Sequence, residues 1–121
     1  MHIVRKDLKN NRLYITLQGV ISSSEAQHVK EKIIEEAEGL LEGFDVINDL
    51  SKLVNADETG GAVLKELSMF FVSKKANRIV RVVGQSKTGL MLFAKYTPST
   101  EYIDIKYVPT LKEAEEYLNQ K

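Results

Sequence analysis

The sequence predicts an α/β fold with a mostly parallel sheet and an N-terminal hairpin edge strand. Three observations predict it: an alternating hairpin pattern at the amino terminus, short β-branched runs further along, and a helical pattern after every strand except the first. The expected order is ββαβαβαβα. A helix that crosses between two strands of one sheet leaves them parallel, so only the first strand should run against its neighbour.

The first two strands follow from the alternation of apolar and polar residues. Leucine and isoleucine alternate with tyrosine and polar residues from Arg12 to Gln18, which is typical of a strand with one buried face. Asn10 and Asn11 indicate a hairpin turn before this strand. Residues 2–8 are therefore expected to form its partner.

The first helix is predicted from a capping pattern. Ser22 and Glu25 have the spacing of a capping box, and apolar residues at helical spacing follow as far as about Gly39. Residues 44–50 then form a short apolar run, which predicts a central strand buried on both faces. Residues 51–56 are expected to be an irregular connection.

The remaining five elements repeat the alternation of helix and strand. Each predicted helix begins at a residue whose side chain can accept a hydrogen bond from the first turn, and each strand is rich in β-branched residues or alternates. The expected elements are a second helix from Asp57 to about Lys75, a strand at 78–83, a third helix that Ser86 caps and Pro98 ends, a strand at 103–108, and a fourth helix after Thr110.

Composition limits the size, location and partners of the protein. Its 121 residues suffice for one domain, expected over 1–121, and its 17 basic and 17 acidic residues cancel. Nucleic acid is not an expected partner, because binders of that class use excess positive charge. The chain has no cysteine and no apolar run as long as a signal peptide or a membrane span, so we expect no membrane contact and a cytoplasmic location.

The strongest candidate site is the turn that opens the second predicted helix, within residues 55–61. Ligands gather at the carboxyl ends of parallel strands, where loops meet helix N-termini with free backbone donors. The acidic residues of this turn complement the helix dipole, and Gly60 and Gly61 allow close approach to the backbone. Helix capping alone also explains the acidic start.

A second candidate turn, at residues 84–89, precedes the third predicted helix. Ser86 and Lys87 suit an anion site there, although Ser86 alone also explains the helix start as a cap. The turn is not a phosphate loop. In that motif the lysine and the hydroxyl residue follow the second glycine, where this sequence has Leu90 and Met91.

No catalytic or metal-binding constellation stands out. His2 and His28 lack a partner at metal-ligand spacing, and both are expected at the surface. Asp45 and Asp49, with the acidic residues of the first turn, suggest a magnesium or receiver-like site. The acidic pair that a receiver domain needs after its first parallel strand is absent, however. We therefore expect no enzyme activity, no cofactor and no metal.

Two features of the second predicted helix concern its surface. A basic cluster at its end and along the next strand is expected to be solvated, and it comprises Lys74, Lys75, Arg78 and Arg81. Met69 and its neighbour Phe70 lie toward a flank of the same helix. That flank is either covered by the third helix or available to a partner.

Residues 46–60 resemble the STAS family of anti-sigma-factor antagonists. The family pattern is an apolar strand ending in Asp-Leu/Phe-Ser, a short connection, and Asp-Ser-Ser/Thr-Gly at the start of the second helix. The family also has the predicted order of elements, so the resemblance implies a SpoIIAA-like fold. The positions of this chain that match the pattern are Asp49, Leu50, Ser51, Asp57, Thr59 and Gly60.

The resemblance implies a non-enzymatic regulatory module for signalling, with a kinase or another regulator as its protein partner. The implied recognition turn is Asp57, Glu58, Thr59 and Gly60. In the family, a partner kinase phosphorylates the first hydroxyl residue after the turn aspartate, and Glu58 holds that position here. Either Thr59 takes over as the phosphate acceptor, or Glu58 acts as a fixed negative charge, weaker than the roughly −1.5 to −2 of a phosphate.

The fold group also contains SpoIIAA-like proteins that are not tied to sigma factors, and it is related in architecture to lipid-carrying domains. This relation implies an alternative function, the carriage of a small apolar ligand between the second and third helices. Such apolar residues equally suit an ordinary core. The residues that would meet a partner are Met69, Phe70, Ser86 and Lys87, and those that would enclose a ligand are Met69, Phe70, Met91, Phe93 and Tyr96.

Overall fold

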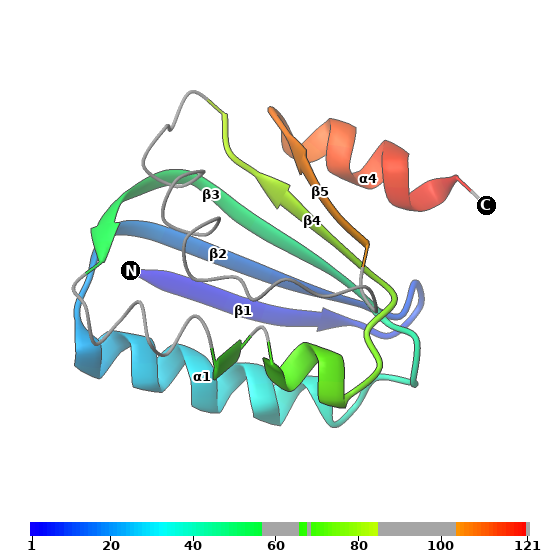
Figure 1. Cartoon of the computed structure of the whole chain (residues 1–121), viewed down its shortest axis with the longest axis horizontal. Helices are drawn as coiled ribbons and strands as arrows, with labels where there is room; N and C mark the ends of the chain where they lie inside the picture. Colours follow the sequence, from blue (N-terminus) through cyan, green and yellow to red (C-terminus); the bar gives the residue numbers. More distant parts are fainter. Residues whose placement is uncertain (57–65, 68, 85–103, 121) are drawn as a thin grey trace.

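The computed structural model describes residues 1–56, 66–67, 69–84 and 104–120, which contain a five-stranded sheet (Figure 1). The strands lie in sequence order, β1-β2-β3-β4-β5. The first pair is antiparallel and every later pair is parallel, which confirms the predicted sheet with its hairpin edge strand. The strands are β1 (His2–Asp7), β2 (Arg12–Ile21), β3 (Asp45–Ala56), β4 (Arg78–Val82) and β5 (Asp104–Val108).

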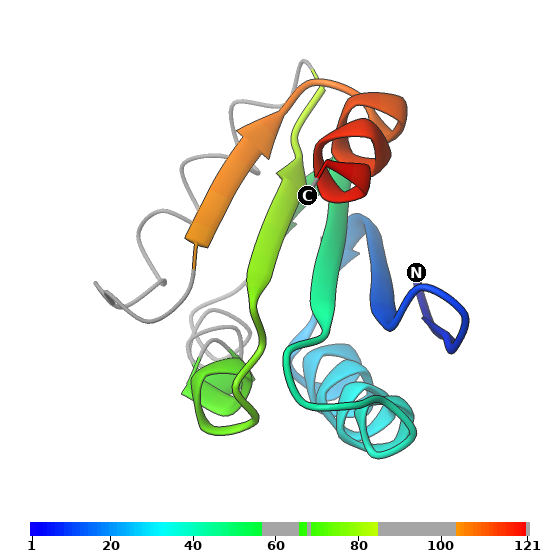
Figure 2. The ribbon, with the colours of Figure 1, turned by 90° about the vertical axis from the view of Figure 1, so that its right-hand side faces the viewer.

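Helices cover both faces of the sheet (Figure 2). Helix α1 (Ser23–Ala37) and the helical residues 69–73 lie on one side, and α4 (Leu111–Asn119) lies on the other. Val46 belongs to the core under α1, whereas its neighbour Ile47 belongs to the core under α4. Both are fully buried, so β3 is the central strand with two buried faces that the sequence predicts.

Both predicted capping patterns are confirmed. The Ser22 hydroxyl oxygen accepts a hydrogen bond from the backbone N–H of Glu25 at 3.2 Å, and that of Thr110 accepts one from Glu113 at 3.1 Å. Each bond satisfies a backbone donor that a helix start otherwise leaves unpaired. The predicted third helix, at residues 86–98, lies outside the described residues.

The predicted connection at residues 51–56 is wrong, because these residues continue β3. They pair with the end of β2 in a parallel ladder that contains two register shifts. One shift precedes the pair Gln18 and Lys52, and the other falls between Gly19 and Val20. Each inserts an extra residue into β3, as a β-bulge does, and so interrupts the alternation by which a strand is recognised in sequence.

The expected solvated face of the basic cluster is wrong at its two arginines, although the two lysines are exposed. Arg81 is buried, with 2% of its surface exposed. Arg78 is half-buried and forms an ion pair with Asp45, with 2.9 Å between Nη2 and Oδ2. Its Nη2 also donates to the carbonyl oxygen of Leu118 at 3.1 Å. The start of β4 thereby holds the carboxyl end of α4 against the sheet.

Candidate functional site

The predicted recognition turn at residues 57–60 lies outside the described residues, as do Ser86 and Lys87 of the second turn. The strands that lead to both turns are described. β3 and β4 are parallel neighbours, so their carboxyl ends point to the same edge of the sheet. Gly84, just past β4, has a φ of +55°, and a methyl group on it would lie 3.1 Å from the Cβ of Ser51 on β3. The close approach and the left-handed backbone both favour glycine here.

Asp49 and Ser51, two of the residues that carry the family resemblance, are bonded to each other. Oδ1 of Asp49 accepts hydrogen bonds from the backbone N–H of Ser51 at 3.1 Å and from its hydroxyl at 2.7 Å. Both bonds span the first bulge of β3, where the ladder to β2 shifts register. A carboxylate that accepts two donors from the following turn fixes the backbone locally. The pair therefore sets the path of β3 toward the recognition turn.

Beyond this bulge, β2 and β3 form a two-stranded extension that runs past the end of the ladder between β3 and β4. Its outward-facing apolar side chains are exposed: Val20 by 65% and Val54 by 60%. Val54 is the extra residue of the second bulge and follows Leu53, whose partner on β2 is Gly19 with a φ of +73°. The extension ends at Ala56, one residue before the recognition turn. Two exposed valines therefore lie on the extension just before that turn.

Comparison with known proteins shows what this fold is. No protein-family model matches the sequence, and no curated protein matches it. The structure is similar to that of the anti-sigma factor antagonist SpoIIAA in its unphosphorylated form, with a TM-score of 0.72 and 11% identity over 100% of both chains. It is also similar to an uncharacterized DUF3478 protein with a SpoIIAA-like fold from Shewanella loihica PV-4, with a TM-score of 0.70 and 11% identity over 98% of this chain and 92% of that chain. The chain has the STAS/SpoIIAA-like fold.

In this SpoIIAA-like domain, the similarity covers the whole length of the chain. It confirms the fold that the residues at 46–60 and the order of elements imply. At 11% identity the likeness is one of fold, and it assigns no binding residue to this chain.

Met69 and Phe70, which the sequence places on a partner or ligand face, differ in exposure. Met69 is 58% exposed. Phe70 is half-buried against the core, and its ring centroid lies 5.8 Å from that of Phe71. The Lys74 ammonium lies 5.9 Å from the centroid of the Phe70 ring. Within the described part of this helix, Met69 is thus accessible to a partner, whereas Phe70 contributes to packing.

A polar row, buried at two of its three residues, crosses the sheet on the α1 side. Asn48, Arg81 and Tyr107 are cross-strand neighbours on β3, β4 and β5. Nη1 of Arg81 donates to the Tyr107 hydroxyl oxygen at 2.8 Å, and burial of the guanidinium lowers the pKa of Arg81. Oδ1 of Asn48 is buried and accepts no hydrogen bond from any described residue.

Sequence reasoning missed this row, although a signal for Arg81 was present. In a strand, residues two apart share a face, so Arg81 lies on the same face as Ile79, which is buried. The alternation within β4 therefore places the arginine on the covered face. Asn48 carried no comparable signal, because a strand buried on both faces has no solvent face to compare with.

The histidines and carboxylates of the described residues do not form a metal site. No group of three or more histidine, aspartate or glutamate side chains there could hold a metal ion. His28 is exposed as expected, whereas His2 is half-buried, with Nδ1 2.9 Å from Oε2 of Glu25. None of the helices within the described ranges is long and apolar enough to cross a membrane.

Proposed function

We propose that this SpoIIAA-like domain is a non-enzymatic regulatory module that binds a protein partner. The proposed recognition site is the turn Asp57, Glu58, Thr59 and Gly60, at the start of the second predicted helix. The observation that carries the proposal is the full-length likeness in fold to an anti-sigma factor antagonist. A kinase or another cytoplasmic regulator is the proposed partner.

The geometry next to the turn supports a protein partner. Val20 and Val54 expose apolar surface on the extension that leads into the turn. Exposed apolar side chains beside a candidate binding loop favour a protein contact over a solvated surface. Ser51 and Asp49 fix the backbone beneath that surface, so the partner meets a preorganised site.

Negative charge in the turn is expected to act on the partner and not on the fold. An acidic side chain near a helix N-terminus is stabilising by about 0.3–1 kcal/mol, because it complements the helix dipole. Glu58, or a phosphate on Thr59, therefore leaves the domain folded. A phosphate of roughly −1.5 to −2 charge would change the potential that the partner meets more strongly than Glu58 does.

Isolation from native cells tests the proposal. The domain is purified with whatever proteins it binds, and its intact mass is measured together with the modification state of Thr59. We expect a stoichiometric protein partner and, if Thr59 is the acceptor, a fraction of molecules heavier by one phosphate. An unmodified Thr59 with no protein partner would contradict the proposed module.

The buried polar row favours one alternative, a carrier of a small apolar ligand. Arg81 and the unpartnered Oδ1 of Asn48 would bind the polar end of such a ligand on the α1 side of the sheet. Native mass spectrometry of the freshly purified domain is the test. A bound small molecule that is lost in Asn48→Leu supports the carrier, and a consistently empty protein rejects it.

A further inference from the structure

The face of the sheet opposite α1 is only partly covered. Helix α4 packs mainly on β3, β4 and β5, and no other described helix lies on that side (Figure 2). Ile3 and Arg5 of β1 point to this side and are exposed, Ile3 by 56%. We call the surface that β1, β2 and β3 form on this side the open face.

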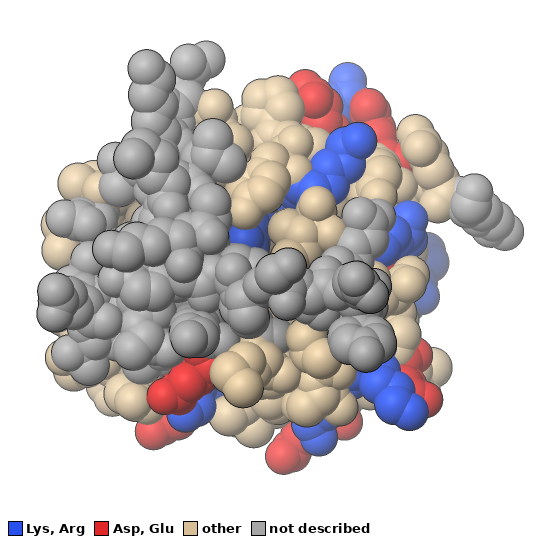
Figure 3. Space-filling view, in the orientation of Figure 1, with Lys and Arg blue, Asp and Glu red and all other residues tan. Residues whose placement is uncertain are grey.

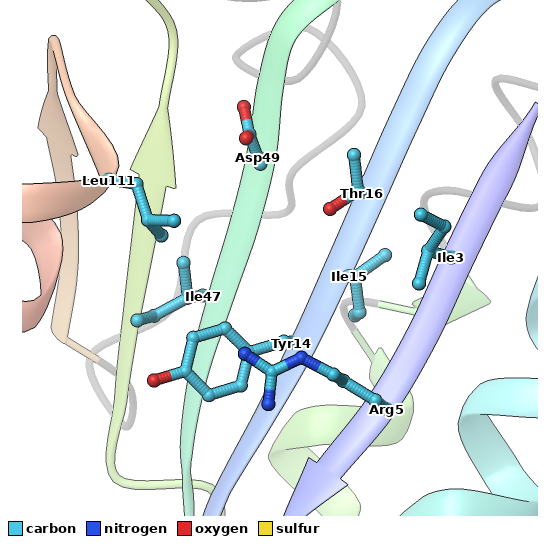
Figure 4. A pocket seen from close by; sticks show the side chains of 8 residues that line it. All are labelled: Ile3, Arg5, Tyr14, Ile15, Thr16, Ile47, Asp49 and Leu111. Atoms are coloured by element: carbon cyan, nitrogen blue, oxygen red, sulfur yellow. The ribbon is translucent and has the colours of Figure 1, made fainter.

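The open face contains a hollow of about 230 Å³ beside the first residue of α4 (Figure 4). Ile3 and Leu111 stand on opposite sides of it, and Thr16 and Ile47 lie between them. The hollow is smaller than the roughly 300–1,000 Å³ of typical small-molecule sites and is open to solvent, so it suits a protruding side chain better than an enclosed ligand.

Opposite charges mark the two ends of the hollow (Figure 4). The Arg5 guanidinium lies over the ring of Tyr14, 3.9 Å from its centroid, and forms no ion pair with any described residue. Oδ1 of Asp49 is engaged by Ser51, whereas its Oδ2 has no hydrogen-bond or ion-pair partner among the described residues. Tyr14 is itself held by a hydrogen bond from its hydroxyl to Glu115 at 3.2 Å. Both charges are therefore fixed in place and available.

We propose that the open face binds an extended segment of a protein that presents an apolar side chain between an acidic and a basic one. The apolar side chain enters the hollow between Ile3 and Leu111. The acidic group pairs with Arg5, and the basic group pairs with Asp49, so the charges set the direction of the segment. A second copy of this chain fits less well, because two concave surfaces that face each other leave a void. This site is separate from the recognition turn and does not depend on it.

Selection of a displayed library of random peptides on the immobilised wild-type protein tests the proposal. We expect enrichment of sequences with an acidic, an apolar and a basic residue in fixed order. A synthetic peptide of that sequence should lose about tenfold or more in affinity for Ile3→Asp and for Arg5→Glu. Lys9→Glu, the same charge reversal on the exposed hairpin loop, should bind like the wild type. Thermal unfolding of each variant confirms that it is folded.

Charge exchange makes the test specific. Replacement of the acidic residue of the peptide by lysine should weaken binding to the wild type and restore it for Arg5→Glu. The proposal is overturned if no ordered motif is enriched or if the selected peptides bind all variants equally. It is also overturned if sedimentation shows a wild-type dimer that Ile3→Asp dissociates, because the second copy would then occupy the face.

Discussion

The side chain of Arg78 connects its own strand, β4, to β3 and to α4. Its guanidinium pairs with Asp45 at the start of β3 and donates to the Leu118 carbonyl near the end of α4. The hydrogen bond from Nε to Asp45 at 3.2 Å makes the pair bidentate. On the face shown in the space-filling view, lysine and arginine side chains lie near acidic ones at several places on the described surface (Figure 3).

Arg78→Ala should therefore destabilise the protein by about 1–3 kcal/mol, because Asp45 is buried and would lose its charged partner. Urea unfolding followed by circular dichroism measures the loss. The control is Lys9→Ala, at an exposed position, which should change the free energy of unfolding by less than about 0.5 kcal/mol. Equal stability of the two variants would contradict the anchoring role.

Asp7 should show a pH-dependent contribution to the β1-β2 hairpin. The hydrogen bond from the Asn10 side chain, at 2.8 Å, is the main reason why the pKa of Asp7 lies below its ordinary value. A carboxylate with a lowered pKa stabilises the fold above its unfolded-state pKa and loses that contribution as the pH falls through the folded value. NMR titration of the Asp7 carboxyl should show the lowered pKa, and Asn10→Ala should raise it.

A titration curve of Asp7 that is the same with and without the Asn10 side chain would contradict this assignment. Lys9→Ala is again the control, since Lys9 is an exposed residue of the same loop and makes only a minor backbone contribution to the pKa.

At the scale of the elements, the stability that the N-terminal cap of α1 contributes can be measured directly. Ser22→Ala removes the acceptor for the Glu25 N–H and should cost about 0.5–2 kcal/mol. Ser22→Gly should lower the free energy of unfolding by only a few tenths of a kcal/mol, because water then reaches the free backbone donor. Differential scanning calorimetry of both variants checks the ranking. If glycine were as harmful as alanine, the hydroxyl would not be acting as a cap.

The caps, the hairpin and the order of the described strands along the chain could be predicted from sequence because their determinants are local. Ser22 and Glu25 are three residues apart, and the alternation of β2 from Arg12 needs no knowledge of the partner strand. The end of β3 could not be predicted in this way. Its two bulges exist only in relation to β2, more than thirty residues away in sequence, and Lys52 and Val54 fall out of alternation because of them.

For the molecule as a whole, the sequence predicted where a site should lie but not which surfaces are left open. The resemblance at residues 46–60 predicted both the fold, which is confirmed, and the turn, which stays a prediction, since that motif is contiguous. The open face and the buried row depend on which helix covers which strand. Arg5 and Asp49 face each other across a hollow only because α4 stops short of β1. No contiguous pattern in the sequence indicates that arrangement.

The proposed recognition turn has one direct test at this scale. Glu58→Lys reverses the charge at the position that the family uses for its switch, and Glu31→Lys makes the same reversal at an exposed position on α1. Affinity for the isolated partner is measured by calorimetry, and stability by urea unfolding. We predict that Glu58→Lys weakens partner binding by about tenfold or more while the free energy of unfolding changes by less than about 1 kcal/mol, and that Glu31→Lys binds normally. Unchanged affinity, or a loss of several kcal/mol in stability, would contradict the account.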